Sequence, residues 1–185
     1  MTEQIVKHAE ERMEKAVAAF RKDAASIRAG RATPAMLEKV TVEYYGSQMP
    51  IPQVASVTSP EPRLLVISPW EKSMLSEIEK AIQKSDLGLN PANDGSVIRL
   101  VIPALTEQRR QELVKQVKKM AEEARVAIRN VRRDANDELK KAEKNGDASE
   151  DDVRRLMERI QQLTDKFVGE IDKAATGKEQ ELLEV

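Results

Sequence analysis

Residues 29–34, Ala-Gly-Arg-Ala-Thr-Pro, and residues 103–106, Pro-Ala-Leu-Thr, bracket a segment unlike the rest of this 185-residue chain. All eight prolines lie between Pro34 and Pro103, as do both tyrosines and the only tryptophan. Proline removes a helix donor and clashes with the preceding turn, so the proline-free flanks can carry long unbroken helices. The sequence therefore predicts a helical body that is interrupted once by an inserted domain of different character.

Three segments of the flanks repeat apolar residues at the three- and four-residue spacing of an amphipathic helix. The first stripe is Val6, Ala9, Met13, Val17, Phe20, Ala24 and Ile27. The second is Leu113, Val117, Met120, Ala124, Ala127 or Ile128, Val131, Ala135, Leu139 and Ala142. The third is Val153, Leu156, Ile160, Leu163, Phe167, Ile171 and Ala174. Matched stripes predict a three-helix bundle within one chain, although an intermolecular coiled coil would use the same stripes.

Capping residues stand at the expected ends of these helices. Gly30 can end the first helix in a left-handed conformation, and Thr106 can cap the start of the second. The second helix, about 38 residues or roughly 57 Å long, is expected to end at Asn145-Gly146. Ser149 and Asp152 form a capping-box-like pair for the third. Because the loop between the second and third helices is short, we expect these helices to be antiparallel.

The insert has a different pattern. Its expected strands cover residues 40–45, 54–58, 63–68 and 96–102, with turns at Gly46-Ser47 and Asp94-Gly95. The segment Ser68-Pro69-Trp70-Glu71 predicts a helix start, and Gly88 is expected to stop that helix. We therefore expect an α+β protein of two domains, with a small β-rich (β/α/β) insert on a double hinge. The expected bundle covers residues 1–30 and 105–185, and the expected insert covers residues 31–104.

Composition limits the class of protein. The formal net charge is −1, so only the distribution of charge bears on an anionic partner. The chain has no cysteine, which excludes disulfides and thiolate chemistry. The N-terminal residues lack the apolar region of a signal peptide, and no apolar run approaches the length of a membrane span. We expect a soluble, cytoplasmic protein without a membrane partner.

Residues for catalysis are scarce. The only histidine, His8, has no second metal-ligand residue at a suitable spacing nearby. Gly177-Lys178 lacks the upstream glycine and the preceding strand of a phosphate-binding loop. We expect no enzymatic activity, no metal, no cofactor and no small-molecule substrate.

The expected second helix carries the most informative charge pattern. Residues 105–143 hold 11 basic and 8 acidic residues, whereas residues 147–177 hold 5 basic and 8 acidic ones. At 100° per residue, one line along the helix, within about 40°, contains Lys118, Arg125, Arg129, Arg132 and Lys140. Arg110 and Arg133 flank this line, and Glu122 interrupts it. Arginine suits phosphate oxygens, but a solvated face with internal ion pairs has the same pattern, so both interpretations stay open.

The two segments that cross between the domains are candidates for a hinge. Two linkers restrict relative motion more than one would, and hinges commonly lie at the ends of elements such as these. A rigid corner is the alternative interpretation.

Four segments of the chain resemble the bacterial ribosome recycling factor (ribosome-releasing factor) family. They are Ile27-Arg-Ala-Gly-Arg-Ala-Thr-Pro34, Leu89-Asn-Pro-Ala-Asn-Asp-Gly95, Pro103-Ala-Leu-Thr-Glu-Gln-Arg-Arg110 and Arg129-Asn-Val-Arg-Arg-Asp134. They are ordered and spaced as in the family, and the resemblance covers essentially the full length. The architecture expected from periodicity alone is also the architecture of the family. The apolar periodicity and the four segments therefore support the same fold.

The resemblance implies an L-shaped monomer of transfer-RNA dimensions. Such a factor enters the ribosome after termination and acts with elongation factor G and GTP to separate the subunits and release messenger RNA and deacylated transfer RNA. The resemblance places the bundle on large-subunit ribosomal RNA and the insert against the GTPase. With the charge line, the candidate RNA contacts are Arg110, Lys118, Arg125, Arg129, Arg132, Arg133, Arg28 and Arg31. The candidate hinge residues are Gly30, Arg31, Ala104 and Leu105.

A structural coiled-coil adaptor that binds protein helices is the alternative function. It predicts oligomers that depend on concentration and no affinity for ribosomes.

Overall fold

The computed structural model describes residues 2–27 and 30–184. The chain separates into two compact units, one formed by Met1–Ala29 with Glu107–Val185 and the other by Gly30–Thr106. The described residues of the first unit form long helices with short turns, and the second unit combines short helices with antiparallel strands. The predicted α+β class with two units is confirmed.

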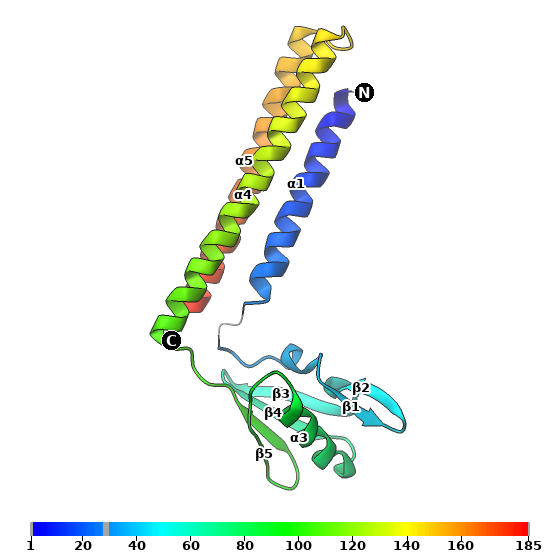
Figure 1. The fold of residues 1–185 in the computed structure, drawn as a ribbon, viewed down its shortest axis with the longest axis vertical. Coiled ribbons are helices and arrows are strands. Elements are labelled where there is room, and N and C mark those ends of the chain that lie inside the picture. The colour runs from blue at the N-terminus through cyan, green and yellow to red at the C-terminus, as the bar shows by residue number, and fades with distance from the viewer. Residues whose placement is uncertain (1, 28–29, 185) are drawn as a thin grey trace. The chain divides into compact units, whose positions relative to one another are not determined.

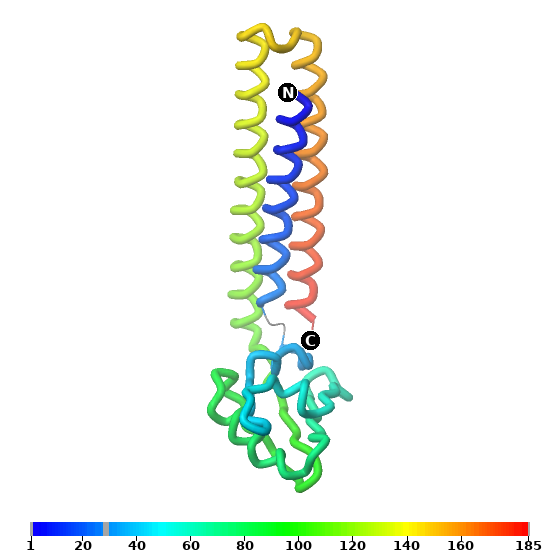
Figure 2. The backbone as a smooth tube through the Cα atoms, turned by 90° about the vertical axis from the view of Figure 1, so that its right-hand side faces the viewer, coloured from blue at the N-terminus to red at the C-terminus, as the bar shows by residue number. Residues whose placement is uncertain are grey.

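The first unit is a bundle of three long helices. They are α1 (Thr2–Ala25), α4 (Glu107–Lys144) and α5 (Glu150–Leu183). Figures 1 and 2 show them side by side, with α4 and α5 joined by a short loop and therefore antiparallel. α4 contains 38 residues, the length predicted from the start and stop signals at Thr106 and Asn145-Gly146.

The core of the bundle follows the predicted stripes with small shifts. Every predicted position of the first stripe is buried. In α4, Ile128 is buried rather than Ala127, and Ala121 is buried in place of Met120. In α5, Thr164 and Ala175 take the places predicted for Leu163 and Ala174, as their buried sets show. Thr164 is tolerated because its hydroxyl donates a hydrogen bond to the Ile160 carbonyl at 2.8 Å.

The ends of the helices agree in part with the predicted caps. The Asp152 N–H donates to the Ser149 hydroxyl at 3.1 Å, so the predicted cap of α5 is confirmed. After α4, Gly146 has a φ of +81°, and the N–H groups of Gly146 and Asp147 donate to Glu143 and Ala142 in a Schellman pattern. The prediction that Gly30 caps the first helix is wrong, because α1 ends at Ala25.

The second unit is built on a four-stranded antiparallel sheet in the order β3-β4-β6-β5. These strands are β3 (Ala55–Glu61), β4 (Leu64–Pro69), β5 (Pro91–Asn93) and β6 (Ile98–Val101). A separate hairpin pairs β1 (Thr41–Tyr44) with β2 (Ser47–Pro50). The helical segments of the second unit are η1 (Pro34–Leu37), α2 (Ile51–Val54), η2 (Lys72–Met74) and α3 (Leu75–Lys84). Side chains of the sheet and α3 form one core, in which Leu65, Ile67, Ile78 and Ile98 are fully buried.

Several local predictions for the insert are wrong. Ser68 and Pro69 do not start a helix, because they pair with Ser56 and Ala55 at the end of β4. α3 begins only at Leu75 and ends at Lys84, four residues before Gly88. Sheet pairing supplies backbone hydrogen bonds over several residues, and this outweighs a local capping preference.

The prediction also missed strands β2 and β5 and placed the turn of the first hairpin one residue too late. β2 and β5 lack the β-branched and aromatic residues that predict strands, and both contain proline. The turn of the first hairpin is Tyr45-Gly46 rather than Gly46-Ser47, because Ser47 already pairs with Tyr44.

The turn Asp94–Val97 between β5 and β6 is tightly hydrogen-bonded. Backbone N–H groups of Val97 and Ser96 donate to the Asp94 carboxylate, and Arg99 pairs with it. These donors lower the pKa of Asp94 to about 2. The predicted hairpin turn at Asp94-Gly95 is therefore confirmed.

We expect Val117→Asp to destabilise the bundle by roughly 3–5 kcal/mol, because it would bury a charge without a partner. Val117 is completely buried in α4. Val126→Asp on the same helix is the matched control, since Val126 is 44% exposed. Thermal and urea unfolding of both variants test this, and equal stability of the two variants would contradict the core assignment.

Candidate nucleic-acid interface

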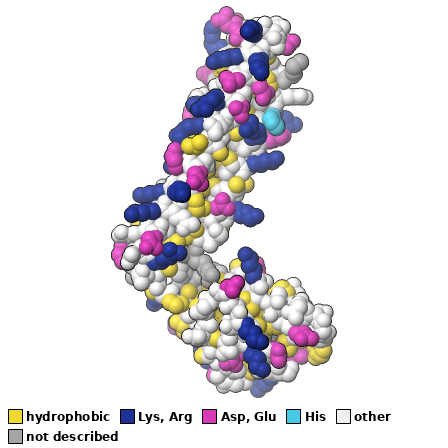
Figure 3. All heavy atoms as spheres, in the orientation of Figure 1, with side chains coloured by type: hydrophobic (Ala, Val, Ile, Leu, Met, Phe, Trp, Pro, Cys, Tyr) yellow, Lys and Arg dark blue, Asp and Glu magenta, His cyan; other side chains and the backbone are white. Residues whose placement is uncertain are grey.

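We call Lys118, Arg125, Arg129, Arg132 and Lys140 the cationic line of α4. Two of its arginines reach α5. Arg125 contacts Asp172 and Arg132 contacts Gln161, and both of these partners belong to α5. Figure 3 shows basic and acidic side chains interspersed over the visible face of the bundle. The line therefore lies on α4, and two of its arginines contact the neighbouring helix α5.

Arg125 is the most engaged residue of the line. Its Nε donates to Glu122 Oε2 at 3.1 Å and its Nη1 donates to Asp172 Oδ1 at 2.7 Å. Its side chain is only 21% exposed. Burial alone would lower the pKa of Arg125, but the hydrogen bonds to Glu122 and Asp172 outweigh this and raise its pKa. Arg125 thus joins α4 to α5, and two of its five N–H donors have carboxylate partners.

Arg129 and Arg132 are held more loosely. Arg129 lies 3.5 Å from Glu122, and its side chain is 45% exposed. Arg132 donates from Nη1 to the amide oxygen of Gln161 at 3.3 Å, and it forms no ion pair with a carboxylate of the described chain. Both side chains can therefore turn toward a phosphate at small cost.

Three other cations of α4 are exposed, and two of them belong to the line. Lys118, Arg133 and Lys140 lie at the surface of α4. Within residues 2–27 and 30–184, none of the three has an ion pair or a hydrogen bond through its side chain. Lys118 and Arg133 were predicted as RNA contacts, and they are available for one.

Arg110, another predicted contact, lies near the end of α5. Its Nη1 donates to the carbonyl oxygens of Glu184 at 2.8 Å and Leu183 at 3.4 Å. A cation at the C-terminus of a helix satisfies free carbonyls and is favoured by the helix dipole. Arg110 therefore fastens the start of α4 to the end of α5, a role that the spacing of charges did not reveal.

The remaining predicted residues belong to the linkers. Arg28 lies outside the described residues, and Arg31 is exposed. Gly30 has a φ of +77°, and a Cβ added there would lie 3.3 Å from Leu105 Cγ. The predicted hinge residue Ala104 is exposed. A side chain at position 30 would thus be strained by the backbone and crowded by Leu105.

Hydrogen bonds hold both linkers to one turn of the insert. The N–H of Ala32 donates to the Pro62 carbonyl, and the N–H of Ile102 donates to the Arg63 carbonyl, each at 2.7 Å. Pro62 and Arg63 form the turn between β3 and β4. Residues 32 and 102 are therefore anchored in the second unit.

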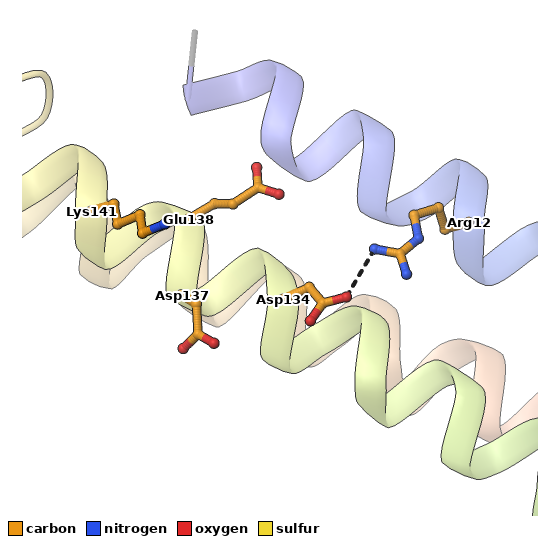
Figure 4. A pocket seen from close by; sticks show the side chains of 5 residues that line it. All are labelled: Arg12, Asp134, Asp137, Glu138 and Lys141. Atoms are coloured by element: carbon orange, nitrogen blue, oxygen red, sulfur yellow. Dashed lines mark hydrogen bonds and ion pairs between the residues drawn. The ribbon is translucent and has the colours of Figure 1, made fainter.

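The side of α4 that faces α1 has a different character. A pocket there is lined by Arg12, Asp134, Asp137, Glu138 and Lys141 (Figure 4). Arg12 of α1 pairs with Asp134 at 3.2 Å across this pocket. With three carboxylates and two cations, the lining of this pocket does not favour an anionic ligand.

Among the described residues, no helix is long and apolar enough to cross a membrane. The same residues contain no group of three histidine or acidic side chains placed to hold a metal ion.

The fold and this surface define a two-unit α+β protein whose long three-helix bundle carries a cationic line on one helix. The model of the family "Ribosome recycling factor" matches residues 20–183. The chain is 57% identical to the ribosome-recycling factors of Halalkalibacterium halodurans and Bacillus subtilis (strain 168), over the whole length of each. It is 60% identical over 177 residues to that of Caldicellulosiruptor bescii, covering 96% of both chains. The chain belongs to the ribosome recycling factor family.

Solved structures agree with this assignment. A solution structure of the ribosome recycling factor matches with a TM-score of 0.76 and 44% identity, covering all of this chain and 98% of the other. A second match has a TM-score of 0.63 and 46% identity, with full coverage of both chains. It is described as models for the T. thermophilus ribosome recycling factor and the E. coli elongation factor G bound to the E. coli post-termination complex.

We expect Arg125→Ala to lower the free energy of unfolding by about 0.5–1 kcal/mol, because it removes a link between α4 and α5. Arg133→Ala is the control, since that side chain has no partner within the described chain. It should change stability by less than about 0.5 kcal/mol. Urea unfolding at low salt measures both, and a larger loss for Arg133→Ala would contradict the assigned roles.

Proposed function

We propose that this protein recycles ribosomes after termination. It binds the post-termination ribosome and, with elongation factor G and GTP, promotes separation of the subunits and release of messenger RNA and deacylated transfer RNA. Family membership supports this proposal, as does the similar protein whose models are bound with elongation factor G to a post-termination complex. The observation that carries it is the cationic line of α4, mounted on a long packed bundle.

The bundle is the part that holds ribosomal RNA of the large subunit. Arg129, Arg132, Arg133 and Lys118 provide cations that can reach phosphates, and Arg110, Arg28 and Arg31 extend the set toward the linkers. A charge-assisted hydrogen bond contributes about 1.5–3 kcal/mol, whereas an exposed ion pair contributes about 1 kcal/mol or less. The exposed pair of Arg129 with Glu122 is therefore weak enough for a phosphate to replace it.

Force comes from the partner and not from this chain. The protein acts as a monomeric, cytoplasmic lever that catalyses no reaction, while the GTPase pushes on the insert. A lever has to be stiff, and the buried stripe of α1, α4 and α5 makes the bundle stiff. Gly30, Arg31, Ala104 and Leu105 form the double hinge. The anchoring of Ala32 and Ile102 to the β3–β4 turn leaves the bending to residues on the bundle side of these anchors.

The adaptor alternative has less support. A coiled-coil adaptor needs an apolar stripe that is free for another chain. The stripes of α1, α4 and α5 are buried against one another in a single chain. Sedimentation at two protein concentrations followed by pelleting with ribosomes separates the two functions.

We expect Arg132→Ala to weaken binding to 50S subunits by about tenfold, the equivalent of one lost charge-assisted contact. It should also reduce the slope of log affinity against log salt by about 0.7–1. Pelleting or fluorescence titration between 50 and 200 mM salt measures both quantities.

Arg154→Ala is the matched control. Arg154 lies on α5, its side chain is 72% exposed, and its ion pairs within the described chain are with Glu150 and Asp151 of its own helix. It should leave both the affinity and the slope unchanged. Equal effects of the two substitutions, or an affinity that does not depend on salt, would contradict the assignment of the line to RNA.

A further inference from the structure

The tip of the β1–β2 hairpin has an unusual residue in its turn. The turn has two central residues, Tyr45 and Gly46, and both have a positive φ, of 48° and 82°. Such type I′ turns favour asparagine, aspartate and glycine, because a side chain is strained at a positive φ. Tyr45 is the only non-glycine residue with a positive φ in the described chain. The chain therefore places a large ring where a small residue is more stable.

The Tyr45 ring is presented to solvent and held in a fixed geometry. Tyr45 is 81% exposed. Its ring meets that of Tyr44 nearly at a right angle, with the ring centres 4.5 Å apart and an interplanar angle of 74°. Both hydroxyls donate to the carboxylate of Glu71, Tyr44 at 3.0 Å and Tyr45 at 3.1 and 3.3 Å. We name Tyr44, Tyr45 and Glu71 the aromatic–carboxylate corner.

The carboxylate of this corner forms no ion pair with the described residues. Glu71 is half-buried, and no lysine or arginine within the described chain forms an ion pair with it. The hydrogen bonds to Glu71 raise the pKa of both tyrosines, so both phenols remain donors at neutral pH. Two ring systems and one anionic group thus meet at the surface without an internal positive charge.

We propose that the aromatic–carboxylate corner receives an arginine or lysine side chain from a protein partner. A cation over a tyrosine face is attracted by the ring quadrupole, and sites that recognise cationic groups combine such rings. Glu71 supplies the opposite charge, and arginine can both stack on a ring and pair with a carboxylate. This inference rests on the proposed function, because it gives the insert a contact with a protein while the bundle holds RNA.

The chemistry of the corner favours a protein over RNA as the occupant. An RNA base could stack on Tyr45, but its phosphates would be repelled by Glu71 and would find no cation within the corner. A basic protein surface meets a complementary charge and an exposed ring together. The occupant is therefore a basic side chain, and the strain at Tyr45 positions the ring for it.

The first test uses the full-length protein and a defined probe. N-acetyl-arginine amide is titrated into the protein, the tyrosine ring resonances are followed by NMR, and N-acetyl-glutamine amide serves as the neutral control. We expect a saturable shift of the Tyr45 resonances with the arginine probe only. The shift of the corner should weaken several-fold in Glu71→Gln and disappear in Tyr45→Asn, measured there on Tyr44. Equal shifts with both probes would overturn the proposal.

Tyr45→Asn is a suitable substitution because asparagine tolerates a positive φ. It removes the ring and should keep or raise the melting temperature of the protein. Glu77→Gln on α3 is the control for Glu71→Gln, since Glu77 is exposed and lies outside the corner. Glu77→Gln should bind the arginine probe as the unmodified protein does.

The second test separates this inference from the proposed function. Subunit splitting by purified protein, elongation factor G and GTP should fall about tenfold in Tyr45→Asn and Glu71→Gln, while binding to 50S subunits stays unchanged. Splitting at the full rate by both variants would overturn the role of the corner even if the probe binds. Tighter ribosome binding by Glu71→Gln would indicate an RNA occupant and would also overturn it. If the unmodified protein does not split ribosomes, the proposed function fails, and the arginine titration still decides what the corner binds.

Discussion

The continuous apolar contact between α1, α4 and α5 is the constraint on which the rest of the structure depends. Met13, Ile128 and Leu156 are completely buried along it, one from each helix. Burial of apolar side chains at about 25 cal/mol per Å² is the dominant favourable term in folding, and interiors packed in this way transmit strain with little compression. This contact keeps 38 residues of α4 in one helix. The spacing of every cation on α4 follows from it.

The exposure and the contact distances of the cations distinguish those that stabilise the bundle from those that can bind a ligand. Arg125 is only 21% exposed and pairs with carboxylates on two helices, so releasing it would leave Asp172 without this partner, whereas Glu122 would keep its contact with Arg129. Arg129 and Arg132 have longer contacts, of 3.5 and 3.3 Å, and one of those partners is a neutral amide. Exposed pairs of this kind contribute about 1 kcal/mol or less. Within the line, Arg125 therefore serves packing, whereas Arg129 and Arg132 are the residues that can exchange their contacts for a ligand.

Much of the fold could be predicted from the sequence because the helical periodicity is long and regular. The stripe of α1 was predicted completely, and the cap at Ser149 was predicted from residue type alone. Adjacent apolar residues such as Met120 and Ala121 could not be separated, since a small change in helix phase over 38 residues exchanges them. Thr164 was missed because a polar residue was not expected in the core, although its hydroxyl is satisfied by its own helix.

The site was less predictable than the fold. Spacing on α4 placed Arg125, Arg129 and Arg132 on one line, but it could not show that this line flanks α5. The partners Gln161 and Asp172 lie about 30 to 50 residues away in sequence and meet α4 only through packing. The same holds in the insert, where Glu71 joins a hairpin tip 26 residues earlier in the chain. Contacts of this kind depend on the fold as a whole and not on any local pattern.

The most direct measurement of the central claim is a polysome-breakdown assay with the purified protein. If a stiff bundle binds ribosomal RNA while a GTPase supplies the force, polysomes should break down only when the protein, elongation factor G and GTP are all present. Polysomes that remain intact with all three components, or that break down equally without elongation factor G, would contradict the account.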